Sequence, residues 1–317
     1  MLNRKNKIVA IIGPTASGKT KLGVYLASKF NGEIVSADSR QVYRGMDVGT
    51  GKDLDDYVVK LKVKSGKLKV VKIPYHLIDV VSPKTEFNLA KYQKLAYGAI
   101  DDILKRGKLP ILVGGSGLYL QAVIDGYVLS EAKPDKKFRD KLEKMDVDKL
   151  FSYLQKIDKK AASEMNESDR NNPRRLIRKI EMIKGGEGGE MMKGEKRYDA
   201  LILGLKPEKE KMEKRIYKRL IERLEEENMI GEVKRLRKQG VSWKRLERFG
   251  LEYRFIALYL QKKINHDEMV EQLFIAIRQF AKRQLTWFRR WEEQGERIDW
   301  VTSKSEAVKS VKGFVKK

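Results

Sequence analysis

A glycine-rich segment near the start of the chain carries the pattern of a phosphate-binding loop. Residues 13–20 have the sequence GPTASGKT, which fits G-x-x-x-x-G-K-[ST]. The glycines let backbone N–H groups point into one concavity, and Lys19 can reach the terminal phosphates of a ligand. The hydroxyl of Thr20 can bind Mg²⁺. The pattern predicts a phosphorylated ligand without naming it, and the expected contact residues are Gly13, Pro14, Thr15, Ala16, Ser17, Gly18, Lys19 and Thr20.

Two further polar segments follow apolar runs. Asp38 comes after the run that ends at Ala37, and Ser116 lies in the sequence GGSG. At the carboxyl end of a strand in a doubly wound sheet, each would face the ligand crevice. Asp38 could then act as a general base or orient Mg²⁺, but it could equally cap the next helix. The glycines around Ser116 could likewise serve only a strand-to-helix turn. Position alone leaves both alternatives open.

The elements that would hold these loops alternate between short apolar runs and helical patterns. This order predicts an α/β fold in which a P-loop NTPase-like parallel sheet is flanked by helices. The run Lys7–Ile12 leads into the phosphate-binding loop, and a helix over Lys19–Phe30 follows it. The other predicted strands are Glu33–Ala37, His76–Val80 and Leu109–Val113, and a second helix covers Leu89–Arg106.

Two segments interrupt this alternation. Residues 53–75 predict a β-hairpin around the turn Ser65-Gly66. Residues 127–195 predict an inserted helical domain that ends in a glycine-rich return loop at 184–194. The catalytic core would then comprise residues 1–126 and 196–317, with a strand over Tyr198–Leu205 that rejoins the sheet and charged helices over 208–292.

The composition limits the class of protein. The chain has 317 residues and a formal net charge of +25. This charge favours a polyanionic partner, although a generally Lys-rich set of solvated helix faces would also explain it. The absence of Cys excludes disulfides and thiol chemistry, and two His are too few for a His-rich metal site. Since no apolar run reaches the ~18 residues that span a bilayer, we expect a cytoplasmic protein without membrane contact. The sequence gives no sign of an oligomer, and a monomer is the default expectation.

Seven segments occur in order along residues 7–292. They are GPTASGKT, ADSRQVYRGMDVGTGK, HLIDV, LVGGSGLY, DRNNPRRLIRKIE, RIYKR and IRQFAKRQLTWFRRW. Together they closely resemble the tRNA dimethylallyltransferases, also called tRNA isopentenyltransferases, of the bacterial type. The resemblance implies that the allylic group of dimethylallyl diphosphate moves to N6 of the adenine adjacent to the anticodon of tRNA on its 3′ side. Mg²⁺ would assist and diphosphate would leave.

The resemblance also implies roles for individual residues. Asp38 matches the catalytic Asp of the family and would accept the N6 proton, while Ser116 stands where the family usually has Thr. Arg219 would stabilise the departing diphosphate, although its surroundings in the sequence alone favour a solvated Arg. The residues implied to contact tRNA are Asp38, Ser39, Arg40 and Gln41 beside the reacting groups, and Arg139, Arg174, Arg175 and Arg178 in the inserted domain.

A basic stretch near the end of the chain could add phosphate contacts. These are expected from Lys282, Arg283, Arg289 and Arg290. Trp287 and Trp291 lie four residues apart, a spacing more typical of a helix core than of base stacking.

Three other functions stay open. A relative could prenylate free adenine nucleotides, but a small acceptor would not need the basic inserted domain. An ordinary P-loop kinase leaves the ADSRQVYRGMD segment unexplained, and a non-catalytic RNA-binding module leaves the phosphate-binding loop unexplained.

Overall fold

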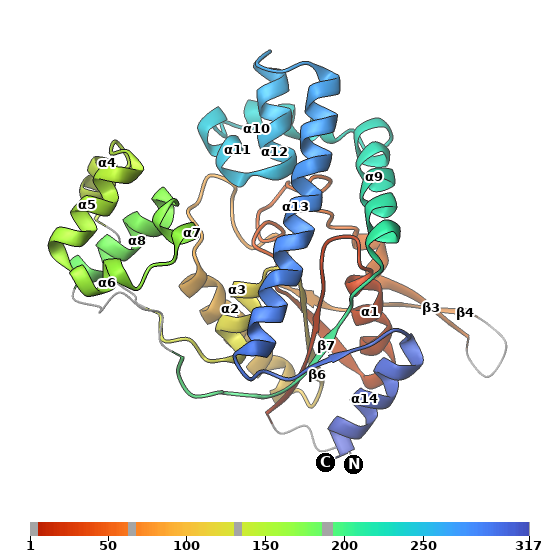
Figure 1. Cartoon of the computed structure of the whole chain (residues 1–317). Helices are drawn as coiled ribbons and strands as arrows, with labels where there is room; N and C mark the ends of the chain where they lie inside the picture. Colours follow the sequence, from red (N-terminus) through yellow and green to blue (C-terminus); the bar gives the residue numbers. More distant parts are fainter. Residues whose placement is uncertain (1–5, 63–67, 130–134, 186–192, 317) are drawn as a thin grey trace. The chain divides into compact units, whose positions relative to one another are not determined.

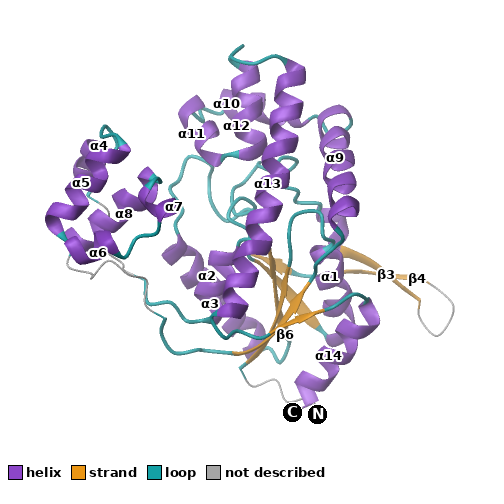
Figure 2. Cartoon of the chain, in the orientation of Figure 1, coloured by secondary structure: helices purple, strands orange, loops and turns teal. Residues whose placement is uncertain are grey.

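Six parallel strands form one sheet in the order β5-β2-β6-β1-β7-β8. The computed structural model describes residues 6–62, 68–129, 135–185 and 193–316. Helices flank the sheet, which confirms the predicted α/β class (Figures 1 and 2). The strands are β1 (Lys7–Ile12), β2 (Gly32–Ser36), β5 (Tyr75–His76), β6 (Leu109–Gly114), β7 (Asp199–Gly204) and β8 (Ile298–Trp300).

Helices cover both faces of this sheet, which is why β1 and β6 are buried along their whole length. One face packs against α1 (Lys19–Phe30) and α14 (Lys304–Lys316). The other face packs against α2 (Leu89–Lys105), α3 (Gly117–Ile124) and the second half of α13 (His266–Glu293).

The register of the sheet decides where the loops meet. Ile12 at the end of β1 lies beside Gly114 of β6, and Ser36 at the end of β2 lies beside Val113. Because these strands are parallel, their carboxyl ends share one edge of the sheet. The loops that follow β1, β2 and β6 therefore start side by side.

The chain divides into two compact units. Residues 1–125 and 196–317 make up the core unit, and residues 126–195 make up the inserted unit. In the core unit, further helices enclose a second apolar cluster together with Val42, Tyr43 and Met46 of the loop after β2. These helices are α9 (Lys209–Glu225), α10 (Met229–Lys238), α11 (Trp243–Phe249), α12 (Leu251–Leu260) and the first half of α13.

The described part of the inserted unit is helical and has its own small apolar core. That core includes Leu150, Leu154 and Leu176. At the two ends of the unit, the Gly194 N–H donates to the carbonyl oxygen of Gly126 at 3.1 Å. The helices are α4 (Lys136–Leu142), α5 (Val147–Ile157), α6 (Lys159–Ser163), α7 (Glu167–Arg170) and α8 (Pro173–Lys184).

The predicted hairpin after residue 53 is present, although its tip lies outside the described residues. A short 3₁₀ turn, η1 (Leu54–Tyr57), leads into antiparallel strands β3 (Val58–Lys62) and β4 (Leu68–Lys72). The predicted turn Ser65-Gly66 and most of the predicted 184–194 loop also fall outside the described part.

The prediction of a strand over His76–Val80 was wrong beyond His76. Leu77 and Asp79 have φ angles of 64° and 57°, in the left-handed region, which a strand cannot include. The Asp79 N–H instead donates to the carbonyl oxygen of Gln41 at 3.0 Å. The chain leaves the sheet here in order to pair with the loop after β2.

Strand β8 and helix α14 were not predicted, because the sequence after residue 292 showed no clear pattern. In the structure Ala307, Val311 and Val315 recur every four residues and are fully buried against the sheet. That spacing is the signal that could have revealed the helix. Among the described residues, no helix is both long and apolar enough to cross a membrane.

Candidate active site

The phosphate-binding loop joins β1 to α1 and ends in backbone N–H groups that are not hydrogen-bonded. Gly18 has a φ of 85°, which is in the left-handed region, and precedes the first residue of α1. Within the described part of the chain, the N–H groups of Gly18, Lys19 and Thr20 have no hydrogen-bond partner. The buried Ser17 Oγ also lacks one. Unpaired donors at a helix N-terminus are the means by which such loops bind phosphate oxygens.

Lys19 is held inside this loop. Its Nζ donates to the carbonyl oxygen of Pro14 at 3.1 Å. Burial lowers the pKa of Lys19 to about 8, while Asp38 opposes this shift and Arg219 adds to it. The three side chains therefore lie close enough to interact electrostatically, although they come from three separate segments.

Asp38 follows the carboxyl end of β2. Its Oδ1 accepts hydrogen bonds from the N–H groups of Arg40 at 2.8 Å and Gln41 at 3.3 Å. Its Oδ2 has no hydrogen-bond partner among the described residues. The capping alternative thus accounts for one carboxylate oxygen, and the other is available to accept a proton.

Ser116 is tied to the same loop. Its Oγ accepts a hydrogen bond from the Ser39 N–H at 3.2 Å, and its own N–H donates to the carbonyl oxygen of Ala37 at 3.3 Å. A Cβ on Gly114 would lie 2.1 Å from that Ala37 oxygen, so only glycine permits this approach. The glycines therefore bring Ser116 against the Asp38 loop and do more than form a turn.

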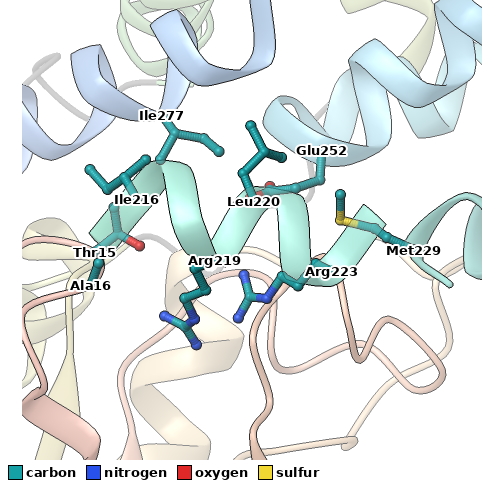
Figure 3. Close-up of a pocket in the computed structure, with 9 residues that line it drawn as sticks. All are labelled: Thr15, Ala16, Ile216, Arg219, Leu220, Arg223, Met229, Glu252 and Ile277. Carbon is teal, nitrogen blue, oxygen red and sulfur yellow. The ribbon is translucent and has the colours of Figure 1, made fainter. Parts of the chain in front are cut away.

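Arg219 lies on α9 and lines a pocket beside the phosphate-binding loop (Figure 3). Arg219 and Arg223 extend from the same face of α9, and both pair with Asp53. Burial raises the pKa of Glu252 above its ordinary value, and Arg223 opposes that shift. The pocket is lined by Thr15, Ala16, Ile216, Arg219, Leu220, Arg223, Met229, Glu252 and Ile277.

Comparison with known proteins identifies the family. A family model described as IPP transferase matches residues 41–291, and one described as isopentenyl transferase matches residues 6–69. The tRNA dimethylallyltransferase 1 of Syntrophus aciditrophicus is 45% identical over 296 residues, which cover 93% of each chain. The chain belongs to the tRNA dimethylallyltransferase family.

Other relatives agree with this membership. The tRNA dimethylallyltransferase 2 of Citrifermentans bemidjiense is 44% identical, covering 95% of this chain and 92% of that protein. The solved tRNA isopentenylpyrophosphate transferase of Bacillus halodurans has a TM-score of 0.66 at 35% identity, covering 98% and 95% of the two chains. A eukaryotic dimethylallyltransferase acting on tRNA has a TM-score of 0.70 at 30% identity, covering 89% of this chain and 69% of that one.

Two buried charged residues that the sequence did not single out fix the loop after Asp38. The Glu232 carboxylate accepts hydrogen bonds from the N–H groups of three successive residues, Asp47 to Gly49, at 2.7 to 3.1 Å. The Lys52 ammonium donates to the carbonyl oxygen of Tyr43 at 2.6 Å and also pairs with Asp79. Glu232 is the only acidic residue of α10 and lies on the apolar face formed by Met229, Val233 and Leu236, and this place in the helix is the signal that could have revealed it.

This loop in turn holds Gln41. The Gln41 Nε2 donates to the carbonyl oxygen of Gly51 at 3.1 Å, and its Oε1 accepts from the Ser36 hydroxyl at 3.0 Å. The guanidinium of Arg40 lies 5.8 Å from the centre of the Phe249 ring. The side chains of Arg40 and Gln41 thus have defined partners, and Ser39 is held through its backbone N–H by Ser116.

A third residue outside the predicted set connects two loops of the site. Gln284 of α13 accepts a hydrogen bond from the Thr15 N–H through Oε1, and its Nε2 donates to the carbonyl oxygen of Gly115, both at 2.8 Å. Its neighbour Trp291 is buried, with Nε1 donating to Asp125 at 3.2 Å. The interpretation of Trp291 as a core residue is confirmed.

The predicted arginines of the inserted unit differ in their surroundings. The Arg139 guanidinium pairs with Glu181, and Arg175 pairs with Asp169. Arg174 and Arg178 lie exposed on α8. The structure thus joins Arg139 and Arg175 to carboxylates and leaves Arg174 and Arg178 facing solvent.

Proposed function

We propose that this protein transfers the dimethylallyl group of dimethylallyl diphosphate to N6 of the adenine adjacent to the anticodon of tRNA on its 3′ side, and releases diphosphate. One observation carries the proposal. At a single edge of the sheet, a loop with unpaired N–H donors and Lys19 faces a carboxylate, Asp38, that has one uncommitted oxygen. Family membership supports tRNA as the acceptor and is consistent with dimethylallyl diphosphate as the donor.

The phosphate-binding loop holds the diphosphate. Its N–H groups, the Lys19 ammonium and the Ser17 hydroxyl supply donors to the phosphate oxygens. As the allylic C–O bond breaks, the electron pair stays on the departing oxygen, and the growing negative charge is stabilised by these donors and by Arg219. Arg219 approaches from α9, where Asp53 orients it.

Asp38 makes the acceptor reactive. The N6 amine of adenine is a poor nucleophile because its lone pair is delocalised into the ring. As N6 forms its bond to the allylic carbon, Asp38 Oδ2 takes the N6 proton, which keeps charge from building on the nitrogen. The Ser116 hydroxyl, which accepts from the Ser39 N–H, retains its own proton to donate to the adenine or the diphosphate.

A Mg²⁺ ion fits this donor set. Among the described residues, no group of three or more His, Cys, Asp or Glu side chains could hold a metal ion alone. Mg²⁺ needs no such group, because it commonly binds through one or two protein oxygens, water and the phosphates of a ligand. The Thr20 hydroxyl would supply the protein oxygen. The ion would neutralise charge on the diphosphate.

The RNA is recognised through a base that leaves its stack, since an adenine in a structured anticodon loop cannot otherwise reach Asp38. Ser39, Arg40 and Gln41 contact this base and its neighbours. The exposed Arg174 and Arg178 of the inserted unit bind the RNA backbone, as do the exposed Lys282, Arg283, Arg289 and Arg290 of α13. We place the reaction in the cytoplasm, carried out by a monomer.

The decisive experiment is mass analysis of tRNA nucleosides after incubation with dimethylallyl diphosphate and Mg²⁺. We expect an adenosine next to the anticodon to gain one dimethylallyl group in place of one hydrogen. AMP tested as the acceptor in parallel should stay unmodified. Modified AMP with unmodified tRNA would support the nucleotide prenyltransferase instead. Release of ADP from ATP would support a kinase, and tRNA binding without consumption of diphosphate would leave a binding module.

A further inference from the structure

We propose that Gln284 is a positioning residue, which sets the distance between the phosphate-binding loop and the loop that carries Ser116. This inference rests on the proposed function, because it concerns the same transfer step. Gln284 itself contacts neither the diphosphate nor the adenine. It acts through the backbone of Thr15 and Gly115, the residues next to Ala16 and Ser116.

The two hydrogen bonds fix how the side-chain amide is oriented. The Thr15 N–H can only donate, so it requires the amide oxygen, and the Gly115 carbonyl can only accept, so it requires the amide nitrogen. Both bonds are 2.8 Å long. Turning the amide over would set donor against donor and acceptor against acceptor. A single side chain thus bridges two loops that follow neighbouring strands, and it adds a side-chain connection to the register of those strands.

The burial of Gln284 makes this connection stiff. The residue is 6% exposed, and both polar ends of its amide are hydrogen-bonded to the backbone of the two loops. A Cβ on Gly115 would lie 2.2 Å from Gln284 Nε2, and a Cβ on Gly117 would lie 2.2 Å from the Trp287 ring. Helix α13 therefore presses directly on the glycine loop, and the absence of side chains there makes the contact possible.

The consequence for catalysis follows from what the two loops carry. One loop places the diphosphate, and the other places the Ser116 hydroxyl against the Asp38 loop. Transfer requires the allylic carbon and the amine to approach in line. A displacement of about 1 Å between the groups that hold them can cost about a hundredfold in rate. A residue that sets this spacing should affect the rate of transfer more than the affinity for either substrate.

The test is a double-mutant cycle. Gln284→Met keeps the size of the side chain and removes both hydrogen bonds, and Ser116→Ala removes the hydroxyl that the connection positions. In the wild-type background we expect Gln284→Met to lower kcat for tRNA prenylation by roughly 10- to 100-fold. In the Ser116→Ala background the same substitution should cost less than about threefold, because coupled residues are not additive. The Kd for tRNA should change less than about twofold.

A matched control separates this role from loss of stability. Gln93 of α2 is similarly buried, at 9% exposed, and its Nε2 donates to the carbonyl oxygen of Ala122 at 2.7 Å. Gln93→Met should lower Tm about as much as Gln284→Met does, and kcat should stay near the wild-type value. If Gln284→Met does not fold, Gln284→Glu replaces it, since it preserves size and sets an oxygen against the Gly115 carbonyl.

Two results would overturn the proposal. One is a kcat for the folded Gln284 variant within about threefold of wild type. The other is an equal loss of kcat in the wild-type and Ser116→Ala backgrounds, which would make the effect independent of the loop. Wild-type protein is measured beside the variants. If wild type fails to modify tRNA, the proposed function is refuted, whereas an active wild type with an equally active Gln284 variant refutes only the positioning role.

Discussion

Strand β2 has a carboxylate near each end, and the two carboxylates have opposite surroundings. Glu33, near the start of the strand, is buried and accepts hydrogen bonds or ion pairs from Arg106, Lys108 and His76. Asp38, just beyond the other end, has one oxygen bound to backbone N–H groups and one without a partner among the described residues. The same strand thus supplies one fully paired acid and one partly uncommitted acid.

This difference distinguishes Glu33, whose charge stabilises the fold, from Asp38, whose carboxylate could take part in a reaction. Arg106, Lys108 and His76 use up the hydrogen-bonding capacity of Glu33 and lower its pKa well below the ordinary value, Arg106 most of all. Such a group stabilises the fold but cannot accept a proton at neutral pH. Asp38 lies close enough to Lys19 to oppose the lowering of its pKa, and its Oδ2 has no hydrogen-bond partner among the described residues. Conversely, Glu33 sits at the amino edge of the sheet, where parallel sheets do not place ligands.

The largest effect is expected from Asp38→Asn. The amide cannot accept the N6 proton, so kcat for tRNA prenylation should fall by about 10²- to 10⁴-fold. The Kd for inorganic diphosphate and the Tm should remain close to wild type, since the backbone hydrogen bonds to Oδ1 survive the change. Single-turnover transfer and calorimetry measure these quantities. Transfer at the wild-type rate would show that Asp38, like Glu33, takes no part in the reaction.

Glu33→Gln should do the reverse. The free energy of unfolding should fall by about 1 to 3 kcal/mol at neutral pH, less than for a fully buried pair, because the three partner side chains keep part of their surface in water. The transfer rate at 25 °C should not change. A lowered carboxyl pKa stabilises the fold above the ordinary value of 4.5, so the difference from wild type should shrink as pH drops below it. Denaturant titration at several pH values checks this, and a loss of activity without a loss of stability would contradict it.

The pH dependence of diphosphate binding tests whether Lys19, the cation near Asp38, contacts the ligand. Burial lowers the pKa of Lys19 to about 8, so its ammonium loses the proton as pH rises through that value. The affinity for inorganic diphosphate should then weaken by up to about tenfold per pH unit above 8. Calorimetry between pH 7 and 9.5 measures it. Lys19→Met should bind more weakly at every pH and lack this dependence, and a slope equal in both proteins would assign the titration to another group.

The smallest effect is expected for the arginines of the inserted unit. Here too, one residue is paired with an opposite charge and another is exposed. Arg174→Ala removes an exposed cation and should lower the slope of log Kd for tRNA against log salt by about one, with kcat nearly unchanged. Arg139→Ala breaks the pair with Glu181 and should act mainly on Tm. Filter binding at several salt concentrations tests both. Equal salt slopes for Arg174→Ala and wild type would remove Arg174 from the RNA surface.

The sequence predicted structure well where all the interacting residues lie in one short segment. The phosphate-binding loop, its strand and its helix lie within 24 residues of chain, 7 to 30, and their pattern was sufficient. Gln284 and Glu232 were missed because their partners lie in loops 169 to 269 residues away along the chain, so that nothing adjacent in the sequence shows what they bind. The early end of β5 escaped prediction for a similar reason, since tertiary hydrogen bonds to the Gln41 loop hold Asp79 in a conformation that an apolar run does not reveal.

The hydrogen bond between Gly126 and Gly194 means that the inserted unit leaves and re-enters the core at neighbouring points of the backbone. A segment attached in this way is a continuous insertion whose two ends lie next to each other. We expect that its length could be changed by design while Asp125 and Lys196 keep their spacing and the sheet keeps its register. If the inserted unit binds RNA as proposed, changes in that binding could be made in one continuous segment of the chain without altering the residues of the sheet.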